Sequence, residues 1–125
     1  MSAQLEFVDP ILGMTDLVDF GLTEVEGAER LYSLRSSESP GLRLYVLDGA
    51  TLPDYAPELS DDQVARLELT SPSDAAVYVV INPAPAAMTV NLLAPIVVNV
   101  KTSKAAQFIL DDARWGISVP LADVA

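Results

Sequence analysis

The chain has 125 residues, a formal net charge of −11 and neither cysteine nor histidine. The absence of these two residue types excludes disulfides, thiol nucleophiles and the commonest zinc ligands. The length is sufficient for one domain, residues 1–125, with its own core. Residues 1–62 carry 13 Asp and Glu against 3 Arg, whereas residues 63–125 carry 5 against 4. Such an acidic field repels phosphate backbones, so it argues against direct nucleic-acid binding and favours a basic protein partner or, alternatively, a surface that only keeps the protein in solution.

The first third of the chain predicts short strands joined by turns. A strand is expected over 5–8, followed by a helical turn over 15–20. Two further strands, over 21–25 and 31–35, are separated by a short turn that contains glycine. This spacing is typical of a β-hairpin.

The middle of the chain predicts one strand, a long connection and a helix. The strand is expected over 42–47, and residues 50–59 contain too much proline for regular structure. Ser60 is followed three residues later by Gln63, the pattern of a capping box, so a helix should run over 61–67. The two aspartates in its first turn suit the helix dipole, which explains them without a binding role.

Residues 75–100 contain no charged side chain, a run long enough to cross a bilayer as a helix. Prolines and asparagines interrupt it, and valine is abundant, so buried β-structure is the better prediction. A strand is expected over 75–82, and two more over 88–93 and 96–100. Because proline cannot donate a ladder hydrogen bond, Pro95 lies either on a sheet edge or at a break between two strands, and we expect the break, near Ala94.

Three residues of this region are candidates for a structural role. Every even position from 90 to 100 is apolar, so one continuous face of the two strands should lie in the core. Asn91 and Asn99 place amides in apolar surroundings, where they need hydrogen-bond partners. We expect both asparagines and Pro95 to be structural, with contact to a partner as the alternative.

The last quarter predicts strands over 106–110 and 117–121. The chain then contains seven or eight strands at roughly ten-residue spacing, with one or two short helices. This pattern predicts a mainly β fold, a small antiparallel β-barrel-like domain, in which closure removes exposed edges. No charged leader followed by an apolar run stands at the start, so the expected location is the cytoplasm.

No residue pattern predicts catalysis. The six glycines are scattered, so no phosphate-binding loop is present, and the spacing of carboxylates carries no information about an acid–base pair. We therefore expect no enzymatic activity, no catalytic residue, no metal and no cofactor. A barrel that binds flavin or another small ligand remains an alternative, although few basic residues are available to meet a phosphate.

Several segments, in order, resemble the FliW family of flagellar assembly factors. Residues 89–99 (TVNLLAPIVVN) match the family's most characteristic segment, and AQFIL follows at 106–110. Upstream, the matching positions are Gly13, Phe20, LYSLRS at 31–36, and Asp54 with Tyr55. The chain departs from the family at Met14, where phenylalanine is common, and at Arg35, where glutamine is common.

The resemblance implies a small β-barrel-like monomer that is a binding protein and not an enzyme. Members of the family bind the translational regulator CsrA and prevent it from repressing flagellin mRNA, and they also bind flagellin. Free flagellin sequesters the factor, and secretion of flagellin releases it to act on CsrA. This chain is therefore expected to work as a partner switch. A rival interpretation is an acidic decoy that competes with RNA.

The acidic first half suits a partner with a basic, RNA-binding surface. The hypothesis is that one acidic face meets CsrA, formed by Glu24, Glu26, Glu29, Glu38, Asp48, Asp54 and Glu58. Asp54 and Tyr55 lie in the proline-rich connection, a place where binding residues are common. The alternative is that Tyr55 only plugs the barrel and Asp54 only caps a turn.

Overall fold

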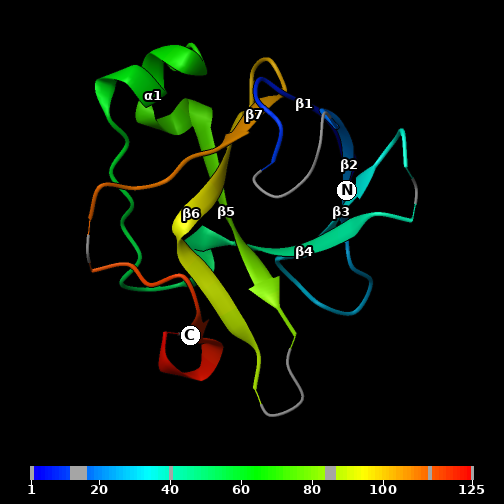
Figure 1. The fold of residues 1–125 in the computed structure, drawn as a ribbon, viewed down its shortest axis with the longest axis vertical. Helices are drawn as coiled ribbons and strands as arrows, with labels where there is room; N and C mark the ends of the chain where they lie inside the picture. The colour runs from blue at the N-terminus through cyan, green and yellow to red at the C-terminus, as the bar shows by residue number, and fades with distance from the viewer. Residues whose placement is uncertain (1, 12–16, 40, 84–86, 113, 125) are drawn as a thin grey trace.

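Seven strands form a closed barrel in the computed structural model, which describes residues 2–11, 17–39, 41–83, 87–112 and 114–124 (Figure 1). The strands are β1 (Ser2–Phe7), β2 (Asp19–Glu24), β3 (Leu31–Ser36), β4 (Arg43–Asp48), β5 (Ala75–Asn82), β6 (Thr89–Asn99) and β7 (Lys104–Gln107). A two-residue strand, β8 (Val119–Pro120), pairs with the start of β6 outside the ring. The predicted mainly β, barrel-like fold is confirmed.

The barrel closes through a parallel pair. Each strand from β1 to β7 pairs antiparallel with the next one in the chain. Because the ring has an odd number of strands, its first and last members run in the same direction, and β1 pairs with β7 in parallel through Glu6–Lys104 and Phe7–Ala105. The expected antiparallel arrangement therefore holds except at this closing pair.

The hairpin and the helix predicted from local patterns are confirmed. β2 and β3 are joined by a turn in which Gly27 has φ 81°, a conformation that favours glycine. Helix α1 (Asp61–Arg66) begins with the predicted capping box, since the Ser60 hydroxyl accepts from the Gln63 amide at 3.2 Å and the Gln63 side chain accepts from the Ser60 amide at 3.0 Å. The described residues also include the 3₁₀ turns η1 (Gly49–Thr51), η2 (Pro72–Asp74) and η3 (Leu121–Asp123).

Other local predictions need correction. The helical turn expected over 15–20 is wrong at its end, because Asp19 and Phe20 belong to β2, and Phe20 is fully buried against Phe7 in the barrel. The start of that turn, with Gly13 and Met14, lies outside the described residues. The strand expected over 106–110 is displaced, because β7 begins at Lys104 and ends at Gln107.

The predicted break at Pro95 is also wrong, because β6 runs without interruption from Thr89 to Asn99. It bends instead. Val80 of β5 faces Asn91, whereas Tyr78 faces Ile96, so a single residue of β5 lies opposite residues 92–95. This irregularity accommodates the proline, because bulged residues do not all contribute to the ladder.

The bulge reverses which side chains of β6 face the barrel. Before it, Val90 and Leu92 pack on the outside of the wall; after it, Ile96 and Val98 point into the interior. The expected single core face along the even positions is therefore wrong. An odd number of extra residues exchanges the two faces of a strand.

The apolar residues form one interior cluster and two outer clusters. The interior cluster receives side chains from all seven barrel strands. On the outer wall of β5 and β6, one cluster around Val79 and Leu92 is covered by residues near the C-terminus, and the other, around Leu67, Val97 and Phe108, is covered by the segment that contains α1. Part of the barrel thus carries a second apolar layer.

Candidate functional site

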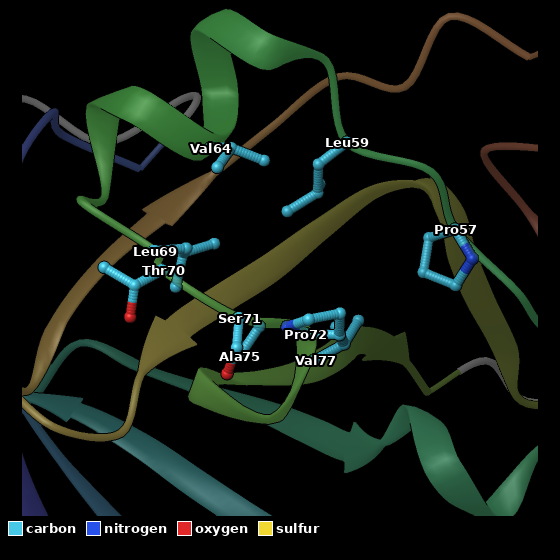
Figure 2. Close-up of a pocket in the computed structure, with 9 residues that line it drawn as sticks. All are labelled: Pro57, Leu59, Val64, Leu69, Thr70, Ser71, Pro72, Ala75 and Val77. Carbon is cyan, nitrogen blue, oxygen red and sulfur yellow. The ribbon is translucent and has the colours of Figure 1, made fainter.

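A groove with a volume of about 460 Å³ lies beside α1, on the outer wall of the barrel (Figure 2). It is lined by Pro57, Leu59, Val64, Leu69, Thr70, Ser71, Pro72, Ala75 and Val77. Figure 2 shows Leu59 and Val64 on the helix side, with Ala75 and Val77 across from them. The lining is mainly apolar and contains neither Lys nor Arg.

The groove continues toward the end of β4. A second hollow of about 310 Å³ shares Pro57, Ala75 and Val77 with the first one and extends to Tyr55 and Asp48. The two hollows together form an elongated depression along the outer face of β5. We refer to them below as the groove.

Tyr55 attaches the connection between β4 and α1 to the barrel. Its hydroxyl donates to the Leu92 carbonyl at 2.7 Å, and its ring packs edge-on against Trp115 with centroids 4.9 Å apart. Burial raises the pKa of the Tyr55 hydroxyl above its usual value of 10.0, so this group stays a hydrogen-bond donor at alkaline as well as neutral pH. The predicted packing role of Tyr55 is thus visible, while its contact with a partner stays a prediction.

Asn99 attaches the end of α1 to the same strand, β6. Its side chain is 2% exposed, its amide nitrogen donates to the Leu67 carbonyl at 2.8 Å, and its oxygen accepts from the Lys101 amide at 2.9 Å. β6 therefore positions both long walls of the groove, one through Leu92 and the other through Asn99.

Asn91 and Pro95 lie at the bulge. The Asn91 oxygen accepts from the amides of Leu93 and Ala94, at 3.1 and 3.0 Å, and so satisfies donors that the bulge removes from the ladder. The Pro95 carbonyl accepts from the Phe108 amide at 3.1 Å. These contacts are internal, and whether the signature residues also meet a partner stays a prediction.

Asp74 joins the floor of the groove to the turn after β6. It is 4% exposed and accepts from the Thr70 hydroxyl at 2.7 Å, from the amides of Thr70 and Ser71 at 3.2 Å, and from the Lys101 ammonium group at 3.2 Å. These partners, led by the Thr70 hydroxyl, lower the pKa of Asp74 from 3.8 to about 2.

We expect Asp74→Asn to lower the melting temperature by several degrees at neutral pH. Because the pKa of Asp74 is depressed in the folded protein, the stabilisation by its carboxylate is complete above pH 3.8 and is lost as the pH falls toward about 2. The difference between the native chain and the variant should therefore shrink over that interval, as followed by circular dichroism melts. Asp123→Asn, at an exposed position, is the control. A difference that stays constant from pH 6 to about 2 would contradict this role.

The structure does not gather all predicted acidic residues on one face. Glu24 ends β2, and the turn that follows carries Glu26 and Glu29. Asp48 lies beside this turn, because its amide donates to the Arg30 carbonyl and its carboxylate accepts from the Arg30 side chain at 2.9 Å. We call these four acids the acidic end. Glu38 follows the opposite end of β3, a strand length of roughly 20 Å away.

Asp54 and Glu58 form a separate group on the connection that walls the groove. Both are exposed, while their neighbours Tyr55, Pro57 and Leu59 turn inward and line the groove. Pro57 and Leu59 were missed as site residues. The signal that could have found them is this alternation of apolar and polar residues within a segment otherwise assigned as irregular.

The segment that builds the groove is strongly acidic. Residues 48–74 contain seven Asp and Glu against one basic residue, Arg66, which pairs with Asp9 at 3.0 Å. Within the described part of the chain, ion pairs occupy two of the seven, Asp48 and Asp74. The five that form no ion pair with a described residue are Asp54, Glu58, Asp61, Asp62 and Glu68.

The groove offers little to an anionic cofactor. Its lining has no basic side chain to meet a phosphate, which weakens the flavin alternative.

Among the described residues, no group of three Asp or Glu side chains could hold a metal ion. No helix in the described parts of the chain has the length and apolar character needed to cross a membrane.

Comparisons with known proteins point to one family. The model of the family described as "FliW protein" matches residues 1–121. Proteins named "Flagellar assembly factor FliW" from Treponema denticola and Syntrophus aciditrophicus are 32% and 34% identical to this chain, over 89% and 86% of it and over 77% and 70% of their own lengths. A crystal structure described as that of the flagellar assembly factor FliW superposes with a TM-score of 0.87 at 28% identity, covering 94% of this chain and 84% of that one.

Proposed function

Because this chain belongs to the FliW family of flagellar assembly factors, we propose that it binds the translational regulator CsrA and relieves the repression of flagellin mRNA. The observation that carries the proposal is the family match, which extends over residues 1–121. The chain acts as a binding protein and catalyses no reaction. It works in the cytoplasm as a monomer and does not contact RNA itself.

Flagellin is the second partner in this proposal. Free flagellin occupies the factor and leaves CsrA active as a repressor; when flagellin is secreted, the factor is released and antagonises CsrA. Among the described residues, we take the acidic end and the groove as the candidate surfaces for these partners.

The acidic end supports the approach to CsrA. A protein that binds RNA presents basic groups, and acidic side chains on a facing surface raise the association rate more than they lower the dissociation rate. Glu26 and Glu29 are exposed on the tip of the β2–β3 turn, where they can act on an approaching partner.

We expect the association rate with purified CsrA to fall about tenfold or more between about 20 and 500 mM NaCl, because exposed charges are screened. Stopped-flow or surface plasmon resonance measures this rate. The double variant Glu26→Gln/Glu29→Gln should bind more slowly at low salt, whereas Glu38→Gln, at the other end of β3, should not. Rates that are independent of salt would refute electrostatic steering.

A pull-down from motile cells tests the function as a whole. We expect the tagged chain to recover both CsrA and flagellin, and recovery of neither would refute the switch. A ternary complex of this chain, CsrA and RNA would exclude the acidic decoy. A flavin absorbance spectrum in the purified protein would instead favour the ligand-binding alternative.

A further inference from the structure

We propose that the groove beside α1 binds a short apolar segment of a partner polypeptide that carries lysine or arginine at its flank. The proposal deepens the proposed function, on which it rests for the assumption that the ligand is a protein. It assigns the groove and not the acidic end to this segment.

The walls of the groove are apolar and incompletely covered. Leu59, Leu69, Ala75 and Val77 pack against the outer cluster around Leu67 but remain partly exposed. Val64 completes this surface from the helix side (Figure 2). Since burial of exposed apolar surface is favourable, an apolar side chain of a partner would gain by entering here.

The rim of the groove selects the charge of the segment. Asp54 and Asp61 are exposed residues of the segment that walls the groove, and Glu58 borders a neighbouring hollow that shares Leu59 with the groove and also contains Asp111 and Asp112. None of these three acids lies within ion-pair distance of a described basic residue; Arg114, which pairs with Asp112, acts on Glu58 only from a longer distance. A cationic flank would therefore be attracted, while a phosphate or an acidic peptide would be repelled.

The shape of the groove favours a chain segment over a compact ligand. Its two hollows, of about 460 and 310 Å³, meet at Pro57, Ala75 and Val77 and extend from Leu69 to Asp48. An elongated, open depression leaves room for several successive residues of a peptide. Binding in a groove of this type depends on a few apolar anchors.

The walls are positioned before any ligand arrives. Three side chains donate hydrogen bonds to distant backbone carbonyls and so hold the walls in place. The Tyr55 hydroxyl donates to the Leu92 carbonyl, and the Asn99 amide donates to the Leu67 carbonyl. The Gln63 side chain donates to the Ile109 carbonyl at 3.1 Å. A rigid groove loses less conformational entropy on binding than a mobile one. Asn99 is in this sense a positioning residue, because it acts on the groove through the end of α1.

The test uses the full ¹⁵N-labelled chain and two synthetic peptides, Ala-Val-Ser-Leu-Ala-Lys-Lys and Ala-Val-Ser-Leu-Ala-Glu-Glu. We expect the lysine peptide to shift the amide signals of Val64, Leu69 and Val77 with a dissociation constant below about 1 mM. The glutamate peptide should bind at least about tenfold more weakly. Equal binding of both peptides, shifts confined to other surfaces, or no shift at about 2 mM would overturn the proposal.

Variants separate the groove from the rest of the fold. Val64→Ser should weaken the lysine peptide, whereas Ala65→Ser, on the exposed side of the same helix, should not. Glu58→Lys should also weaken it, while Glu38→Lys should have no effect. Glu58 and Glu38 are exposed, so these two variants remain informative even if Val64→Ser affects folding.

Purified CsrA and flagellin then connect the groove with the function. We expect Val64→Ser to weaken one of them at least about tenfold and Ala65→Ser to weaken neither. If neither protein binds the native chain, the proposed function fails and the peptide result stands by itself. If both bind Val64→Ser as tightly as the native chain, the function stands and the groove is not their site.

Discussion

Replacing Asn99 with alanine is expected to lower the free energy of unfolding by about 2–3 kcal/mol, because the Leu67 carbonyl and the Lys101 amide both lose their partner and the buried carbonyl stays unsatisfied. Chemical denaturation followed by circular dichroism measures the change. The matched control is Asn82→Ala, an exposed asparagine at the end of β5, for which the change should stay within about 0.5 kcal/mol.

The same variant separates two roles of Asn99. A large loss of stability supports the structural role that its internal hydrogen bonds indicate. If stability is unchanged while binding to CsrA or flagellin is lost, Asn99 is instead a partner contact. Weaker binding of the lysine peptide by a variant that is still folded would support its action on the groove through α1.

Tyr55→Ala is expected to cost about 2–4 kcal/mol, since it removes the hydrogen bond to Leu92, the ring contact with Trp115 and part of an outer apolar cluster. Tyr55→Phe keeps the ring and should cost about 1 kcal/mol, the net value of one hydrogen bond. Urea denaturation of both variants measures the difference.

Trp115, the only tryptophan of the chain, gives a second readout. In Tyr55→Ala its fluorescence emission should shift to longer wavelength, because water reaches the face that Tyr55 covers. Tyr55→Phe should leave the emission unchanged. Equal and small effects of both variants would mean that Tyr55 does not anchor the connection.

Both substitutions act on strand β6. β6 carries Asn99 at its end and the Leu92 carbonyl at its bulge, so it meets both walls of the groove. The segment that resembles the family signature therefore lies under the groove and need not touch a partner to affect binding. In this arrangement, a substitution in β6 can change the groove without altering any residue that lines it.

The positions of the acidic residues on the barrel could be predicted only in part from the sequence. Charge counts predicted an acidic surface in the first half of the chain, and β2, β3 and β4 do bring Glu24, Glu26, Glu29 and Asp48 to one end of the barrel. Glu38 is also acidic but lies beyond the other end of β3. Successive turns between antiparallel strands lie at alternate ends of the barrel, so acids that are close in sequence can lie at opposite ends.

Local patterns in the sequence determined several elements of this protein. The capping box at Ser60 and Gln63, the hairpin around Gly27, the strand over 75–82 and the family resemblance depend on neighbouring residues or on ordered motifs, so they could be predicted without coordinates. The mainly β class followed from the number and spacing of the strands.

Only the tertiary structure decided which faces of those strands are inside and where the groove lies. Pro95 does not break β6, because the register with β5 absorbs residues 92–95 as a bulge that reverses the faces of the strand. The groove joins residues from 48 to 77, and its walls depend on bonds from Tyr55 and Asn99 to distant carbonyls. Register and long-range hydrogen bonds are properties of pairs of segments, and no single segment of the sequence contains them.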